Sequence, residues 1–165
     1  MSNYSAIDVS TYIINYSCDI NSPVNNLKLQ KLLYYVQAAL LVETGKKCFE
    51  SKVVAWGFGP VVVESYQHYK EYGRNNIPKQ EENKRMKFDS KTMKIIFEPA
   101  KKIDEITKKI INKVVDSYAK ITNPFDLVRK THEEDPWKNA QLNTEIKCKD
   151  IQKYYEKQPE KIYGV

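Results

Sequence analysis

The chain has 165 residues, of which 41% are hydrophobic and 29% charged, and its formal net charge is +6 at pH 7. This length fits a single domain with one core, and the composition excludes a disordered or low-complexity protein. A basic balance of this size is compatible with a nucleic acid, a membrane surface or an acidic protein as partner, and it selects none of them.

A helix near the N-terminus is predicted over about residues 6–17. Ser5 followed by Asp8 has the S-x-x-D form of a capping box, which satisfies free amide groups of the first turn. Apolar side chains then recur at helical spacing, at Ala6, Val9, Ile13 and Tyr16. The stretch CDINSPVNN contains a proline and three asparagines and ends this helix.

A second helix is predicted from Asn25 or Asn26 to Thr44, with Gly45 as its C-cap. One face carries a core stripe of Leu29, Leu32, Leu33, Val36, Ala39 and Leu40. The opposite face is also apolar and consists of Leu27, Tyr34, Tyr35, Ala38, Leu41 and Val42, with Lys31 among them. Such a helix either passes through the centre of the domain or uses its second face to hold a partner.

The next segment, KKCFESKVVAWGFGPVVVESYQHYKEYG, combines a short apolar run with two glycines and a proline. Gly57 and Gly59 permit unusual backbone angles, and Pro60 suits the first turn of a helix. We expect a helix from about Pro60 to Tyr72, closed by Gly73. The glycines do not predict a phosphate loop, because GFGP lacks the lysine and the further glycine of that motif.

The polar stretch PKQEENKR separates this segment from a region with alternating apolar residues. The sequence MKFDSKTMKIIF predicts a short β-hairpin that turns at Asp89 and Ser90. From about Pro99 to Ile121, apolar residues at intervals of three or four predict a long amphipathic helix.

Two further helices complete the predicted fold. Asn123 and Pro124 are typical of an N-cap and a first helical residue, for a helix that ends near THEEDPW. A short helix is expected over about residues 150–156. The fold class is therefore mainly α, a single compact helical domain over residues 1–165 with about six helices and a short hairpin near residues 86–98.

Residues suited to catalysis or metal binding are sparse. Two histidines and three separated cysteines lack the spacing of zinc ligands, so we expect no metal site and no cofactor. Cys48 paired in space with His68 or His132 is an alternative reading as a nucleophilic pair. A second alternative is an acid and base cluster formed by His132 with Glu133, Glu134 and Asp135. Cys48 is equally explained as an ordinary small residue, and the charges around His132 as a solvated helix end.

The odd number of cysteines indicates a reducing compartment. The first residues lack the basic and apolar regions of a signal peptide, and no apolar run approaches the ~18 residues of a membrane span. We therefore expect a soluble, cytoplasmic protein that does not contact a membrane.

Three motifs follow one another along the chain: LKLQKLLYYVQ at residues 27–37, AWGFGPVV at 55–62 with Tyr66 after it, and THEEDPW at 131–137. Their order resembles the Panacea domain, the antitoxin domain of SocA-like and phage-associated GepA-like proteins. The resemblance covers roughly residues 5–156. It implies a small, mainly helical, cytoplasmic protein that neutralises the product of a neighbouring toxin gene by direct protein–protein binding and is not an enzyme.

Carried onto this sequence, the resemblance defines three signatures. The helix signature consists of Leu29, Lys31, Leu32, Tyr34 and Tyr35. The turn signature consists of Trp56, Gly59, Pro60, Val61 and Tyr66, and the C-terminal signature of His132, Pro136 and Trp137. Two departures are visible. Ala38 and Ala39 replace a glycine and an aromatic residue that members often have, which can reshape a groove and change the partner, and Asp135 replaces a second proline.

Among these residues, Lys31, Tyr34, Tyr35 and Trp56 are the candidates for partner contact, because aromatic side chains and a few placed charges supply most interface energy. The other signature residues are interpreted as structural: a turn, a helix start and a core contact below the last helix. The positive net charge favours an acidic toxin surface and a faster encounter.

Two alternative functions remain open. A proteolytic adaptor would hold the toxin on one surface and a protease chaperone on another. A nucleic-acid-binding regulator of its own operon would bind DNA with a steep salt dependence. We rank DNA binding last of the three, because no helix-turn-helix with a basic recognition helix is apparent.

Overall fold

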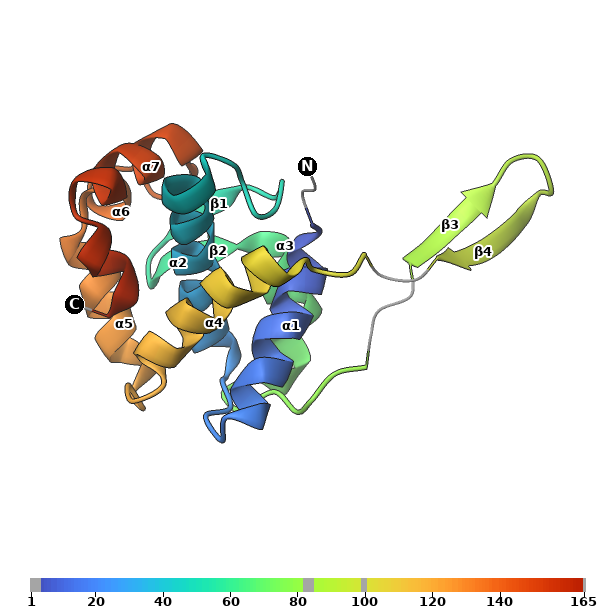
Figure 1. Cartoon of the computed structure of the whole chain (residues 1–165), viewed down its shortest axis with the longest axis horizontal. Coiled ribbons are helices and arrows are strands. Elements are labelled where there is room, and N and C mark those ends of the chain that lie inside the picture. The colour runs from blue at the N-terminus through green and yellow to red at the C-terminus, as the bar shows by residue number, and fades with distance from the viewer. Residues whose placement is uncertain (1–3, 82–84, 99–100, 165) are drawn as a thin grey trace.

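The computed structural model describes residues 4–81, 85–98 and 101–164. They form a helical body with a small antiparallel sheet, and a β-hairpin projects from this body (Figure 1). The elements up to residue 72 are α1 (Ala6–Asp19), α2 (Asn26–Thr44), β1 (Val53–Trp56), β2 (Gly59–Val62), α3 (Val63–His68) and the 3₁₀ helix η1 (Lys70–Tyr72). The later elements are β3 (Arg85–Asp89), β4 (Lys94–Glu98), α4 (Glu105–Tyr118), α5 (Pro124–Glu133), α6 (Asp135–Lys138), β5 (Glu145–Ile146), α7 (Cys148–Lys157) and η2 (Pro159–Tyr163). The predicted mainly α fold with a short hairpin is confirmed, with seven α-helices in the described residues rather than about six.

The first two helices begin and end where local signals predict. The Asp8 N–H donates to Ser5 Oγ at 3.0 Å, and α1 continues two residues beyond the expected end. The Lys28 N–H donates to Asn25 Oδ1 at 2.9 Å at the start of α2. Gly45, at φ +72°, ends that helix in the left-handed conformation that glycine tolerates best.

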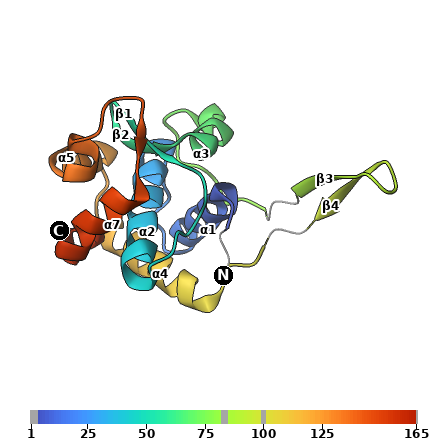
Figure 2. The same cartoon turned by 90° about the horizontal axis from the view of Figure 1, so that it is seen from above.

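Helix α2 runs through the centre of the body (Figures 1 and 2). Helices α1, α4, α5 and α7 and strand β2 all pack against it. Every residue from 28 to 41 is buried. The second apolar face of α2 is therefore covered by the protein's own chain. It is not left open for a partner, and the alternative of a central helix is the one that the structure shows.

The predicted helix from Pro60 to Tyr72 is wrong in its first part. Residues 59–62 form strand β2, which pairs antiparallel with β1 across a tight turn. Pro60 is followed by three valines, and β-branched residues favour a strand. Strand β2 lies at the edge of the sheet β2-β1-β5, where a residue without an N–H is tolerated. Helical structure is limited to α3 and η1, which ends at Gly73 as expected.

The predicted hairpin is confirmed as β3 and β4, with Met86 opposite Phe97 and Phe88 opposite Ile95. Its turn lies at residues 90–93, slightly later than expected. Asp89 holds this turn, since its carboxylate accepts hydrogen bonds from the Lys91 N–H and from Thr92 Oγ1, both at 2.9 Å. Figures 1 and 2 both show the hairpin standing clear of the helical body.

The C-terminal helices follow the prediction with shifted boundaries. Helix α4 is shorter than the expected span of 99–121, because Asp104 caps it by accepting from the Thr107 N–H at 2.8 Å. Residues 99 and 100 of that span lie outside the described residues. Asn123 caps α5 as predicted, and α7 extends slightly beyond the expected residues 150–156 at both ends. Among the described residues, no helix combines the length and apolar character needed to cross a membrane.

Candidate partner-binding site

Residues of the three signature motifs meet in the interior around Lys31. Lys31 is fully buried, and its Nζ donates a hydrogen bond to the carbonyl oxygen of Pro60 at 3.1 Å. One residue earlier on α2, Gln30 Oε1 accepts a hydrogen bond from the Val62 N–H at 3.0 Å. Two polar side chains of the central helix therefore hold the backbone of edge strand β2.

Burial controls the charge of Lys31. Loss of hydration around the ammonium group lowers the pKa of Lys31 to about 7. Near neutral pH a substantial fraction of the folded molecules therefore carries a neutral amine at this position. The contact with Pro60 does not depend on charge, because both forms of the side chain can donate a hydrogen bond.

Gly59 allows α2, β2 and α5 to approach one another at this point. Its φ is +106°, a conformation that side-chain-bearing residues rarely adopt. A Cβ atom added there would lie 2.7 Å from Thr131 Oγ1 and 2.8 Å from Lys31 Cε. Only glycine fits at position 59, because Lys31 of the helix motif and Thr131 of the C-terminal motif both lie so close to it.

The third motif packs beside this contact through its aromatic residues. The His132 and Trp137 rings stack with centroids 3.8 Å apart and planes 12° apart. Trp137 Nε1 donates to the carbonyl oxygen of Trp56 at 2.8 Å, which ties α6 to the end of β1. Desolvation lowers the pKa of His132, the charge of Lys31 adds to this shift, and a backbone hydrogen bond with Gly57 opposes it.

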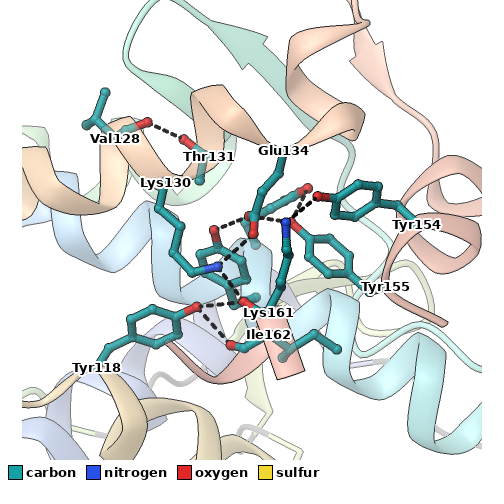
Figure 3. A network of polar contacts seen from close by, with 11 residues as sticks. Tyr118, Val128, Lys130, Thr131, Glu134, Tyr154, Tyr155, Lys161 and Ile162 are labelled. Carbon is teal, nitrogen blue, oxygen red and sulfur yellow. Dashed lines mark hydrogen bonds and ion pairs between the residues drawn. The ribbon is translucent and has the colours of Figure 1, made fainter. Parts of the chain in front are cut away.

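The tyrosine face of α2 is closed by a second polar cluster, centred on Glu134 (Figure 3). Glu134 Oε1 accepts hydrogen bonds from the hydroxyl groups of Tyr35 at 2.5 Å and Tyr155 at 2.8 Å. Lys130 Nζ donates to Glu134 Oε2 at 2.7 Å, and the Tyr34 and Tyr155 hydroxyls are 3.0 Å apart. Because Glu134 is 3% exposed, this carboxylate joins α2, α5 and α7 inside the protein.

Aromatic stacking and a cation extend the same cluster. The rings of Tyr35 and Tyr118 stack at a centroid distance of 5.0 Å, and Lys130 Nζ lies 4.7 Å from the centre of the Tyr35 ring. The Tyr118 hydroxyl donates to the carbonyl oxygen of Ile162 at 2.8 Å, which fastens η2 to α4 (Figure 3). Burial raises the pKa of Tyr35 well above its usual value, so the tyrosine stays a neutral donor.

The sequence-predicted contact residues are mostly interior. Lys31, Tyr34 and Tyr35 are at most 1% exposed, so a partner does not touch them in this conformation. Trp56 is half-buried. Of the structural signature residues, Tyr66, His132 and Trp137 are half-buried, and Leu29, Leu32, Gly59, Pro60, Val61 and Pro136 are buried.

Two aromatic pairs reach the surface at the turn between β1 and β2. Phe58, in this turn, is 62% exposed and meets Phe125 of α5 edge to face at a centroid distance of 5.8 Å. Trp56, at the end of β1, meets Tyr66 of α3 in the same way at 5.1 Å. Sequence reasoning missed Phe58 and Phe125, although the exposed position of a residue between two glycines was a usable signal.

The sequence predicted Glu134 only as part of an acid and base cluster with His132, and it did not predict the buried cluster that Glu134 forms with Lys130 and the tyrosines. Glu134, the residue that caps the end of α5, follows Lys130 by four residues, and this spacing was the local signal for an ion pair. Tyr118 and Tyr155 gave no such signal, because each is more than 80 residues from the tyrosine of α2 that it contacts.

The alternative catalytic groupings find little support in the geometry. Burial raises the pKa of the Cys48 thiol to about 12, which disfavours the thiolate that a nucleophilic cysteine needs. His68 is exposed, and His132 stacks on Trp137. No group of three or more metal-ligating side chains occurs within the part of the chain that the structure describes.

Comparisons with known proteins point to one family. The family described as "Antitoxin SocA-like, Panacea domain" matches residues 29–138. Antitoxin SocA of Caulobacter vibrioides (strain NA1000 / CB15N) is 32% identical over 69 residues, which span 42% of this chain and 37% of that protein's length. No solved structure matches. The family match runs through the helix, turn and C-terminal signatures that meet around Lys31, and the chain therefore belongs to the SocA-like antitoxin family with a Panacea domain.

Proposed function

We propose that this protein is a cytoplasmic antitoxin that neutralises a protein toxin by binding it directly, without catalysis of its own. The observation that carries the proposal is the family match over residues 29–138, which includes residues of all three motifs. The relative named Antitoxin SocA supports the same functional class. The toxin is the product of a neighbouring gene.

The surface that we assign to this binding lies at the turn between β1 and β2. The exposed rings of Phe58 and Phe125 supply rigid apolar anchors, and Trp56 adds a third aromatic ring with a polar edge. Lys31 contributes indirectly, because it fixes Pro60 beside this turn.

Tyr34 and Tyr35 also contribute indirectly, by holding α5 in place. Tyr35 bonds Glu134 directly, and Tyr34 joins the same cluster through Tyr155, so both fix the end of α5, the helix that carries Phe125. The net charge of +6 favours a toxin with an acidic surface, mainly by raising the rate of encounter.

Co-expression of the adjacent gene under a tight promoter, with and without this protein, tests the proposal. The adjacent gene should arrest growth alone, and this protein should restore growth and co-purify with its product. Phe58→Ala should weaken both effects without changing thermal stability, while Ile106→Ala, which removes a comparably exposed side chain from α4, should leave both unchanged. A toxic product that neither binds this protein nor is relieved by it would refute direct neutralisation.

The adaptor alternative gives a different result in the same cells. There the half-life of the toxin would fall when this protein is present, and it would recover in a strain that lacks the protease. Under direct neutralisation, the toxin persists in the complex at an undiminished level in both strains.

A further inference from the structure

The hairpin of β3 and β4 has an apolar face that no other part of the described structure covers. Met86 and Phe88 on β3 are directly opposite Phe97 and Ile95 on β4, so their four side chains share one face of the ribbon. These side chains are 59% to 69% exposed. With large side chains of roughly 200 Å² each, the face presents on the order of 500 Å² of apolar surface, at the upper end of what a monomer usually exposes.

A two-stranded ribbon with one apolar face is marginally stable in water on its own. The hairpin nevertheless stands clear of the helical body in both views (Figures 1 and 2), so the body does not bury that face. The face is therefore available to a partner without any rearrangement of the core.

Charge restricts what the partner can be. Residues 85–98, which form the hairpin, contain four basic and two acidic residues, so the hairpin has a net charge of +2. A second copy of the chain would bring two such segments together, and like charges at an interface are repulsive. Two faces of this size would also bury about 1,000 Å² in total, below the range of standard stable interfaces. A partner with acidic residues around an apolar surface fits better than a second copy.

The shape of the hairpin favours a cleft in a protein over a lipid bilayer. The turn at residues 90–93 consists of Ser90, Lys91, Thr92 and Met93, and Asp89 accepts hydrogen bonds in it from Lys91 and Thr92. Met93, 73% exposed, is the single apolar side chain of this turn. Met86, Phe88, Ile95 and Phe97 lie along one face of the ribbon, behind this mainly polar turn. A hairpin that inserts its end into lipid would carry most of its apolar residues at the turn itself, whereas an apolar face along the two strands suits a groove.

We propose that the apolar face of this hairpin, formed by Met86, Phe88, Ile95 and Phe97, docks into an apolar cleft with an acidic rim on the toxin. The proposal rests on the proposed antitoxin function and gives the toxin a second contact, separate from the aromatic turn between β1 and β2. A projecting hairpin can enter a cleft that the rounded helical body cannot reach.

Neighbouring residues provide a matched test. Ile95 lies on the apolar face, and Ile96 lies on the opposite face of the same strand. Ile95→Asp should weaken the complex with the purified product of the adjacent gene about 100-fold or more, because it places a charge in a desolvated contact. Ile96→Asp should change the affinity by less than about fivefold. Both variants should keep the wild-type melting temperature, and Phe88→Asp serves as a second variant of the apolar face.

The outcomes separate this proposal from the one on which it rests. If the wild-type protein does not bind the product of the adjacent gene, both the antitoxin proposal and the docking proposal are refuted. If the wild type binds, equal affinity of the Ile95→Asp, Phe88→Asp and wild-type proteins overturns the docking proposal alone. Loss of a wild-type dimer in Ile95→Asp, with toxin affinity unchanged, would assign the face to a second copy. Loss of binding to mixed phosphatidylcholine and phosphatidylserine vesicles, again with toxin affinity unchanged, would assign it to lipid.

Discussion

Replacing Gly59 by alanine tests the packing on which the signature motifs converge. The new Cβ would lie 2.7 Å from Thr131 Oγ1 and 2.8 Å from Lys31 Cε, closer than such atoms approach in folded proteins. It would also force a residue with a side chain to adopt a φ of +106°. The substitution therefore combines a backbone penalty with a steric one.

Both contributions have known sizes. An unfavourable backbone conformation costs about 1–3 kcal/mol, and overpacking of a well-packed site adds about 1–3 kcal/mol. Lys31 can relieve part of the clash by moving its flexible end, but the movement would disturb its hydrogen bond to Pro60. We therefore expect Gly59→Ala to lower the free energy of unfolding by about 3 kcal/mol, and Tm by about 6–12 °C for a domain of this size.

Thermal unfolding followed by circular dichroism measures this difference, with Gly57→Ala as the control. An added Cβ at Gly57 meets nothing within 4 Å, and its backbone does not have the positive φ of Gly59. Gly57→Ala should change Tm by less than about 2 °C. If Gly59→Ala melts within 2 °C of the wild type, or if the two variants melt alike, the close approach at Gly59 does not exist as described.

Three further predictions concern polar groups that are buried or half-buried. Glu134→Gln should destabilise the fold by about 2–3 kcal/mol in chemical denaturation, because it leaves Lys130 without its counter-charge; an unchanged midpoint would contradict this. The pKa of Lys31 is about 7 in the folded state and ~10.4 in the unfolded state. Between pH 7 and ~10.4, the unfolded chain therefore holds a proton on Lys31 that the folded protein has lost. Wild-type stability relative to Lys31→Met should therefore rise by up to ~1.4 kcal/mol per pH unit from pH 7 to 9, and a constant difference would refute the shift. Trp137→Phe should cost about 1–2 kcal/mol in thermal unfolding, because it removes the hydrogen bond to Trp56; no loss would show that this bond is dispensable.

The parts of the fold that local chemistry determines were predictable from the sequence. Ser5, Asn25 and Asn123 each cap a helix through their own side chains, and Gly45 ends one through its backbone. The helix predicted from Pro60 failed because proline is compatible with both a first helical turn and an edge strand. The neighbouring strand and the three following valines decided in favour of the strand.

The sequence predicted the signature residues of the site, but it predicted neither their arrangement nor the exposed rings of Phe58 and Phe125. The two apolar faces of α2 were visible in the sequence, but the cover of Tyr34 and Tyr35 comes from Tyr118, Tyr155 and Glu134, far along the chain. No periodicity connects residues that are so distant. The resemblance grouped the motifs correctly by family, whereas their contact through Gly59 required the three-dimensional structure.

We propose that this protein neutralises a toxin by binding alone. The most direct measurement titrates the purified adjacent gene product with the purified protein, in the absence of any protease, and follows the toxic activity. Direct neutralisation predicts complete inhibition at a fixed molar ratio, together with a stable complex on a sizing column. Full toxic activity at a large excess of this protein would contradict it.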